Sequence, residues 1–186
     1  MQQTPAEQGS VIRSARPGDE HALFRLVQAL AEYENLSHTV TGSAAQLAQH
    51  LFSPHPAAGA LLVEVDVQPV AFALFFHNYS TFLTLPGLYL EDIFVLPEYR
   101  RQGIGKALLS EVAKIAHTRG CGRMEWSVLD WNASAIGFYE SLGARVLPDW
   151  RICRVTGAEL DALASSARAP SAAAPAAPTP SAALKE

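Results

Sequence analysis

Leu88–Leu109, LYLEDIFVLPEYRRQGIGKALL, is the stretch that decides the predicted fold. Apolar, β-branched and aromatic residues dominate its first part, as in a buried strand, and a proline follows them. From Lys106 onward, apolar residues recur at the spacing of one helix face. The turn Arg100–Gly105 lies between the two, and a glycine turn that opens a helix directs backbone N–H groups at one spot, where the helix dipole favours negative charge. The stretch therefore predicts a phosphate-binding turn whose two arginines add cationic donors.

Two common nucleotide-binding motifs do not fit this turn. No Gly-Lys-Ser/Thr follows at the spacing of the nucleoside-triphosphate loop, and the three glycines of the dinucleotide fingerprint are absent. On these residues alone, ligand binding and ordinary loop chemistry are both open interpretations.

Two adjacent acids, Glu91 and Asp92, interrupt the apolar run of the predicted strand. Neighbouring residues of a strand face opposite sides, so at most one of them is expected to point into a given pocket. They are either solvated acids of an edge strand or, if the turn holds a ligand, one of them faces its reactive end.

Composition favours one folded domain without a nucleic-acid partner. The chain has 186 residues, 49% of them hydrophobic, and a net charge of −4, so no basic face is expected. Its two cysteines, Cys121 and Cys153, are too few for a disulfide scaffold, and its six histidines show no metal-ligand spacing. No apolar run reaches membrane-spanning length and the start lacks a signal-peptide core, so we expect a soluble cytoplasmic protein.

The rest of the chain predicts a single α/β domain with a mixed, mostly antiparallel central sheet and helices on both faces. Early hairpins give antiparallel pairing, and the later strand–helix–strand unit gives a parallel pair. The expected strands are about 11–15, 60–65, 70–79, 88–95, 123–129, 144–147 and 151–155, and the expected helices are about 19–34, 43–51, 106–116, 134–142 and 157–164.

The ends of the chain are expected to lie outside this domain. Residues 1–9 are polar, and residues 165–186 are almost entirely Ala, Pro and Ser, which cannot bury enough surface to offset their ordering entropy. We therefore expect a flexible start at 1–9, one folded domain over 10–164, and a disordered tail at 165–186.

The pattern Arg100-x-x-Gly103-x-Gly105 behind an acidic strand resembles the acetyl-CoA loop of the GNAT N-acetyltransferases. The resemblance implies that acetyl-CoA is the acetyl donor, that the amides of the turn hold its pyrophosphate, and that the N–H of Phe94 or Val95 polarises the thioester carbonyl. The cofactor-binding residues that it implies are Ile93, Phe94, Val95, Arg100, Arg101, Gln102, Gly103, Ile104, Gly105, Lys106, Asn132, Ala135 and Tyr139.

A second segment, Leu129–Glu140, resembles the part of this family in which an Asn opens a helix that carries a Tyr. A phenol has a pKa near 10 and is a proton donor at neutral pH, so Tyr139 could protonate the thiolate of CoA as it leaves. Helix packing is the preferred interpretation of its neighbour Phe138. The family's Asn touches the pantetheine arm or its neighbouring helix, and Asn132 is expected to do the same.

The reaction needs a neutral amine. An alkylammonium has a pKa near 10.4, so holding it neutral at pH 7 costs roughly 4 kcal/mol, and a carboxylate that takes its proton meets part of that need. Glu91 is the candidate base, and His77 is the alternative because it ends a strand near the expected cleft. No metal is required.

Three further segments, Ala29–Glu34, Phe75–Phe82 and Tyr89–Val95, resemble the diamine acetyltransferases, which include spermidine/spermine and thialysine acetyltransferases. The resemblance spans about residues 11–160. It implies an amine site lined by Tyr33, Glu34, Glu91, Asp92, Trp126 and Ser127. An acidic site suits a cationic substrate.

One residue departs from the polyamine enzymes, which carry an extra acid in the stretch where this chain has the neutral Ser80. The run Asn-Tyr-Ser-Thr around it is similar to the thialysine type, so a lysine-like amino acid is favoured over spermidine. Two alternatives remain, a GNAT enzyme for a protein amine or an antibiotic, and an acetyl-CoA sensor without turnover. The family resemblance also suggests a homodimer.

Overall fold

The computed structural model describes residues 9–167, so nearly all of the predicted flexible start and most of the predicted tail lie outside the described residues. The chain divides into two units, Met1–Asn132 and Ala133–Glu186.

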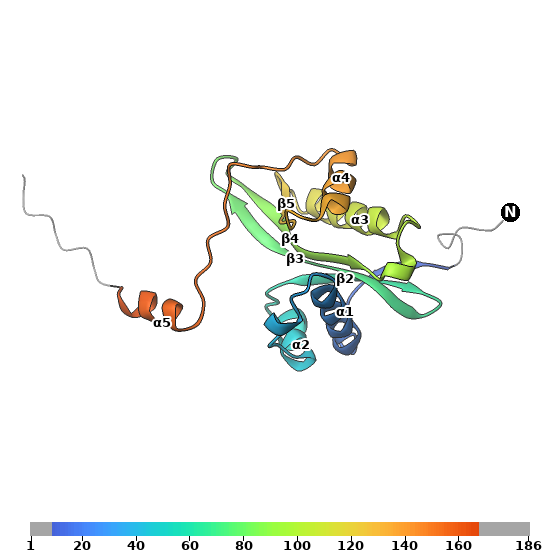
Figure 1. The fold of residues 1–186 in the computed structure, drawn as a ribbon, viewed down its shortest axis with the longest axis horizontal. Helices are drawn as coiled ribbons and strands as arrows, with labels where there is room; N and C mark the ends of the chain where they lie inside the picture. Colours follow the sequence, from blue (N-terminus) through green and yellow to red (C-terminus); the bar gives the residue numbers. More distant parts are fainter. Residues whose placement is uncertain (1–8, 168–186) are drawn as a thin grey trace, which may run out of the picture. The chain divides into compact units, whose positions relative to one another are not determined.

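The first unit is built on one five-stranded sheet (Figure 1). Its strands follow one another in space in the order of the sequence, and they are β1 (Val11–Ser14), β2 (Gly59–Val65), β3 (Gln68–Ser80), β4 (Leu85–Val95) and β5 (Met124–Trp126). The first four pair antiparallel, and β5 pairs parallel with β4 after a crossover through a helix. The predicted mixed, mostly antiparallel sheet is confirmed.

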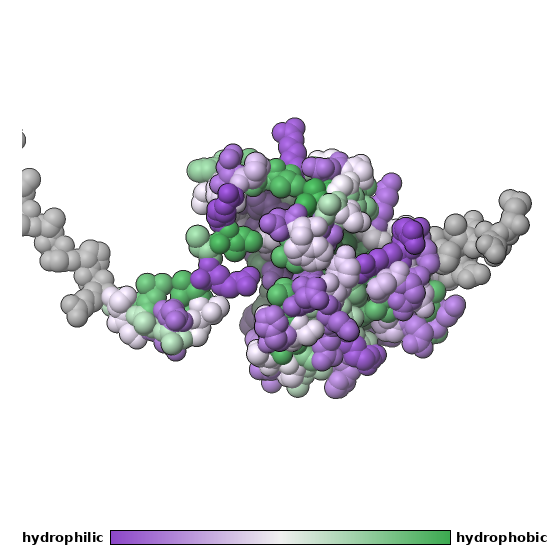
Figure 2. Space-filling model, in the orientation of Figure 1, coloured by the Kyte–Doolittle hydropathy of each residue, from purple (hydrophilic) through white to green (hydrophobic). Residues whose placement is uncertain are grey.

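Helices cover both faces of this sheet, as predicted. Helices α1 (Glu20–Tyr33) and α2 (Ala44–Phe52) lie on one face, and α3 (Ile104–Thr118) lies on the other (Figure 1). The outward side of α1 and α2 carries mostly hydrophilic residues (Figure 2). Their inward side packs with the sheet into an apolar core, formed by Leu23, Leu26, Leu51, Ala60, Leu62, Phe72 and Phe94.

Local signals place the ends of these elements. Helix α2 begins where the Ser43 hydroxyl accepts a hydrogen bond from the Gln46 N–H at 3.2 Å. Helix α1 ends where Asn35 adopts a left-handed φ of 60° and the Leu36 N–H donates to the Ala31 carbonyl at 2.7 Å. This C-terminal motif fixes the last turn of α1 beside the sheet.

Strand β4 contains a bulge at Glu91. Leu74 on β3 pairs with Asp92 and Phe75 pairs with Leu90, so Glu91 has no partner in the register. A bulge adds one residue to the strand and reverses the alternation of its side chains. Asp92 therefore shares the α1 face of the sheet with Phe94, which belongs to the core on that side, while Leu90 faces α3.

The second unit contains α4 (Ala133–Ser141) and α5 (Gly157–Ser165) and corrects one expectation. The strands predicted at 144–147 and 151–155 are not formed, and no other strand lies among the described residues of this unit. A strand needs a neighbour that completes its backbone hydrogen bonds, and Pro148 between the two segments cannot donate one.

Two boundaries also differ from the sequence prediction. The strand predicted at 123–129 is formed only at Met124–Trp126, and helix α3 begins at Ile104 instead of Lys106. Short 3₁₀ helices at Ser37–Thr39 and Pro97–Tyr99 were not predicted. In residues 9–167, no helix combines the length and the apolar character needed to cross a membrane.

Candidate functional site

The glycine-rich turn forms an open helix N-terminus. Gly103 is the N-cap of α3 with a left-handed φ of 82°, Arg101 has a φ of 60°, and no side chain caps the helix. The first N–H groups of a helix have no partner within it. The space beside Gly103 is open, because a Cβ on this residue would meet nothing within 4 Å. The Ile104 side chain is buried, so the turn presents its backbone. These features fit an anionic group such as a phosphate.

The strand that leads into this turn has an open edge. Strand β5 pairs with β4 only at Leu88, Tyr89 and Leu90, so the part of β4 from Glu91 to Val95 has no described strand on that side. Successive N–H groups of a strand point to alternate edges, so the N–H of either Phe94 or Val95 points away from β3. A thioester group lying along this edge would find a main-chain donor there.

The side chain of Arg100 reaches from the turn to Tyr33 at the end of α1. Its Nε donates to the Val95 carbonyl at 2.9 Å, and its guanidinium lies 4.2 Å from the centre of the Tyr33 ring and 5.4 Å from that of Phe94. The first arginine of the turn is thus directed towards the side chains that the sequence assigned to the amine site.

Three carboxylates gather beside these rings. Glu34 is the C-cap of α1, and Glu91 and Asp92 are consecutive on the bulged part of β4. Burial, together with the negative charges of Glu91 and Glu34, raises the pKa of Asp92 to about 6, and burial also raises the pKa of Glu34. None of the three forms an ion pair with a described Lys, Arg or His. We call these three residues the acidic cluster.

An aromatic wall adjoins the acidic cluster. The Tyr33 ring lies 6.3 Å from the Phe94 ring and 6.2 Å from the Trp131 ring, centre to centre. Trp131 is not among the residues that the sequence predicted for the site. Its place directly before Asn132, in the segment that resembles the family, was the only signal that could have identified it.

The two β5-side residues predicted for the amine site lie apart from each other. Trp126 pairs with Leu90, which faces α3, so Trp126 lies on the face opposite Asp92. Ser127 follows on the other face, where its hydroxyl is 2.7 Å from the Tyr89 hydroxyl.

His77, the alternative base, is also away from the acidic cluster. It pairs with Leu88 on the α3 side of the sheet, and its two ring nitrogens lie 3.2 Å from the Gly87 carbonyl oxygen and 3.1 Å from Arg119 Nη1. Since Nδ1 then donates to the carbonyl, Nε2 accepts from the arginine and holds no free lone pair for a substrate.

The remaining predicted residues begin at the end of the first unit. The Asn132 N–H donates to the Leu129 carbonyl at 2.9 Å in a turn. Ala135 and Tyr139 lie on α4, where the Phe138 and Tyr139 rings are 5.4 Å apart. The roles predicted for these residues stay predictions.

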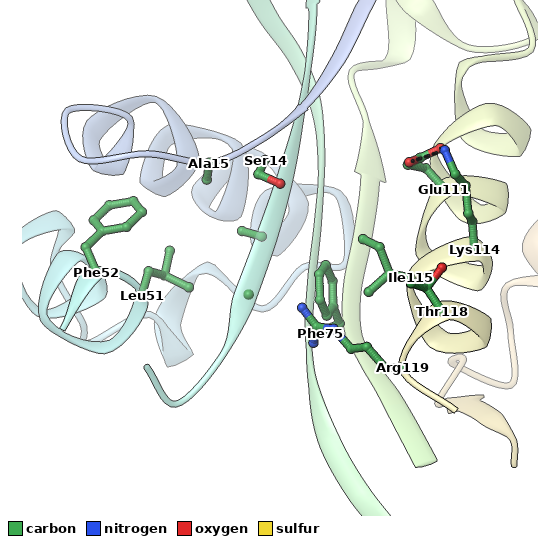
Figure 3. Close-up of a pocket in the computed structure, with 12 residues that line it drawn as sticks. Ser14, Ala15, Leu51, Phe52, Phe75, Glu111, Lys114, Ile115, Thr118 and Arg119 are labelled. Atoms are coloured by element: carbon green, nitrogen blue, oxygen red, sulfur yellow. Dashed lines mark hydrogen bonds and ion pairs between the residues drawn. The ribbon is translucent and has the colours of Figure 1, made fainter. Parts of the chain in front are cut away.

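A cavity of about 330 Å³ opens elsewhere in the first unit, between α2, β3 and α3 (Figure 3). Its walls include Leu51, Phe52, Phe75 and Ile115, and its acid, Glu111, is paired with Lys114 at 3.2 Å. It contains none of the predicted site residues and no unpaired acid for a cationic amine, so the acidic cluster is the stronger candidate. In residues 9–167, no group of three or more His, Cys, Asp or Glu side chains is placed to bind a metal ion.

Comparison with known proteins gives a consistent result. The family model described as the acetyltransferase (GNAT) family matches residues 25–144. An L-ornithine N5-acetyltransferase of Arabidopsis thaliana is 36% identical over 83% of this chain and 87% of its own length, and a thialysine N-epsilon-acetyltransferase of Sus scrofa is 38% identical over 83% and 96%. Among solved structures, an integron cassette protein from the mobile metagenome of V. cholerae matches with a TM-score of 0.67 and 27% identity, over 84% of this chain and 98% of that one. The chain therefore belongs to the GNAT family of N-acetyltransferases.

Proposed function

We propose that this enzyme transfers the acetyl group of acetyl-CoA to the side-chain amine of a small cationic amino acid such as ornithine, lysine or thialysine. A diamine or polyamine is the second substrate class. One observation carries the proposal: an acidic cluster that has no described cationic partner lies beside an aromatic wall, and Arg100 from the turn before α3 lies over the Tyr33 ring of that wall. A cationic substrate would supply the missing positive charge.

Acetyl-CoA would bring an activated acetyl thioester and a pyrophosphate. The N–H groups at the start of α3 would hold the pyrophosphate, and the open edge of β4 would offer a donor to the thioester carbonyl. The residues proposed for cofactor binding are Ile93, Phe94, Val95, Arg100, Arg101, Gln102, Gly103, Ile104, Gly105, Lys106, Asn132, Ala135 and Tyr139.

The acidic cluster would also take the proton of the substrate ammonium, directly or through a water. Glu91 is the base that the sequence predicted. The burial of Asp92 and the charges around it make this second carboxylate the better match to a base that works near neutral pH, since its pKa is about 6. Both remain candidates, and their Gln and Asn variants separate them.

Tyr139 is proposed as the acid that protonates the departing thiolate. A phenol at neutral pH carries the proton that this step requires. Tyr139→Phe is expected to slow turnover and to leave acetyl-CoA binding unchanged, whereas full turnover at every pH would remove this assignment.

The region around Ser80 supports an amino acid over a polyamine. Ser80 is buried, with 3% of its surface exposed, and its hydroxyl accepts a hydrogen bond from the Leu83 N–H at 3.2 Å. Ser80 is the last residue of β3, its hydroxyl stabilises the turn to β4, and it adds no negative charge for a distal ammonium. The relatives named for ornithine and thialysine agree with this preference.

The state of the protein in the cell stays a prediction. Resemblance to the family suggests a homodimer, and we propose a cytoplasmic location and no nucleic-acid partner on the grounds of composition. Size-exclusion chromatography with light scattering would measure the oligomeric state.

The test of the function is a comparison of initial rates. Ornithine, lysine, thialysine and spermidine are each supplied with acetyl-CoA, and the products are identified by mass spectrometry. We expect acetylation of the side-chain amine of the amino acids with a higher kcat/KM than that of spermidine. A clear preference for spermidine would contradict the substrate class, and retention of CoA without any acetylated product would support the sensor.

A further inference from the structure

The aromatic wall offers one ring to a ligand. Phe94 is buried, with 4% of its surface exposed, because it belongs to the core under α1. Tyr33 is more exposed, at 37%, but the Arg100 guanidinium lies over its ring at 4.2 Å. Trp131 is 53% exposed and only its contact with Tyr33 is described.

The occupied face of Tyr33 has a consequence for substrate binding. An aromatic face that already holds a guanidinium does not also accept the ammonium of a substrate, since like charges repel. Arg100 is also held by the hydrogen bond from its Nε to the Val95 carbonyl at 2.9 Å. Arg100, which the proposed function places at the cofactor, therefore also holds the Tyr33 ring, and this ring lies against the indole of Trp131.

The acidic cluster alone cannot measure the length of a substrate. Carboxylates attract any ammonium, and this attraction depends weakly on the methylene groups that separate two charges. An indole offers a large apolar area to a methylene chain and the best cation–π surface among the side chains. A length-dependent contact at this site therefore requires an apolar surface next to the acids.

We infer that Trp131 determines substrate specificity by packing against the methylene chain of the amine, between its reacting nitrogen and its distal charged group. This inference rests on the proposed function and deepens it. The substrate class that it favours is an ω-amino compound with a flexible methylene chain, and amines too short to reach the indole would gain nothing from it.

The test uses the full-length protein and three variants. Trp131→Ala removes the surface, Trp131→Phe keeps a smaller aromatic ring, and Phe82→Ala is the matched control, since Phe82 is an aromatic residue that is 95% exposed on the turn between β3 and β4. Thermal unfolding and circular dichroism confirm that each variant is folded. KM and kcat are then measured for lysine, ornithine and the short amine ethylamine, and KM is also measured for acetyl-CoA.

We expect Trp131→Ala to raise the KM for lysine by about tenfold with a much smaller change in kcat, which corresponds to the loss of one good aromatic contact. Trp131→Phe is expected to keep most of the affinity. The preference for lysine over ethylamine should fall, while the KM for acetyl-CoA and the kinetics of Phe82→Ala should stay the same.

Two results would overturn the inference. One is an equal rise in KM for every amine irrespective of chain length, and the other is a rise in the KM for acetyl-CoA as large as that for lysine. Failure of the proposed function is a different outcome, because the wild-type enzyme would then acetylate none of these amines. In that case, calorimetric titration measures the affinity of wild type and of Trp131→Ala for lysine in the presence of CoA, which tests the role of the indole independently of turnover. Equal affinities of the two proteins would overturn the inference.

Discussion

The first unit holds two groups of carboxylates that differ in how their charge is balanced. Asp19 and Glu64 share one arginine: Arg13 binds Asp19 through both carboxylate oxygens, at 2.6 and 2.9 Å, and Glu64 at 2.5 Å. The hydrogen bonds from Arg13 lower the pKa of Asp19. The acidic cluster has no such arginine, and burial together with two neighbouring acids raises the pKa of Asp92.

This difference indicates that the first group of carboxylates serves the stability of the fold and that the acidic cluster serves ligand binding. Arg13 links β1 to β2 and to the start of α1, and it forms ion pairs with both Asp19 and Glu64 within the protein. The acidic cluster instead holds partly buried negative charge at a cost, because like charges repel and each ion loses hydration. Such unfavourable electrostatic free energy is expected at a binding site, where a ligand offsets it. A cationic amine is the ligand that would do so here.

The strongest test of this contrast is Asp92→Asn. We expect kcat/KM for the amine to fall by about 100-fold or more, since a neutral amide neither attracts the ammonium nor accepts its proton. Steady-state kinetics at pH 8 measures the loss. Glu91→Gln is the matched control: the larger loss identifies the base, and a larger loss in Glu91→Gln would return the role to that residue.

The same substitution should stabilise the fold. The pKa of Asp92 is about 6 in the folded state, whereas its ordinary value is 3.8, so ionisation of Asp92 destabilises the folded state. The folded protein keeps its full stability below pH 3.8 and loses this contribution as the pH rises through 6. Asp92→Asn avoids this cost and should raise the free energy of unfolding by about 2–3 kcal/mol at pH 8, and by much less near pH 4. Urea unfolding at both pH values measures it, and destabilisation at pH 8 would contradict the electrostatic account.

Arg13→Ala should have the opposite effect. Two partly buried carboxylates would lose their partner, and the free energy of unfolding should fall by about 2–3 kcal/mol at neutral pH. Because the pKa of Asp19 is lowered in the folded state, its contribution is present above its ordinary pKa of 3.8 and is lost as the pH falls below that. The effect of Arg13→Ala should therefore shrink in acid.

The matched control for this variant is Lys114→Ala, which removes an ion pair on the surface of α3. The Lys114 side chain is 72% exposed, and such pairs contribute about 0–1 kcal/mol. Equal effects of the two variants in urea unfolding at pH 7 would show that the burial of the Arg13 group does not matter.

The contrast also shows how far sequence reasoning reaches. The turn before α3 and the strand before it follow from local patterns, glycine placement and apolar periodicity, and both were predicted correctly. The bulge at Glu91 depends on how β4 pairs with β3, so the pattern of β4 alone predicted strict alternation, and the position of Asp92 could not be derived from it. The pair of Arg13 and Glu64 joins residues 51 positions apart, which periodicity does not relate.

The absence of strands at 144–147 and 151–155 has a similar cause. Alternating apolar residues give a segment the propensity for a strand, but a ladder forms only with a neighbour, which is a property of the assembled sheet. Trp131 was missed for the same reason, because its contact with Tyr33 joins the end of α1 to a loop almost 100 residues later. Local signals thus predicted most of the elements and the turn, whereas the bulge in β4, the two missing strands and the contact of Trp131 with Tyr33 depend on tertiary pairing.

The smallest expected effect in the acidic cluster is that of Glu34→Gln. Glu34 raises the pKa of Asp92 through its charge, and it is the last of the three causes after burial and Glu91. Removal of this charge should lower the pKa of Asp92, so the acid limb of the pH–rate profile should move to lower pH by less than about one unit. The measurement is kcat/KM for lysine between pH 5 and about pH 9. If the limb instead moves upward, or keeps its place while Asp92→Asn abolishes it, Glu34 does not act on the base through its charge, and its place in the acidic cluster serves only to attract the amine.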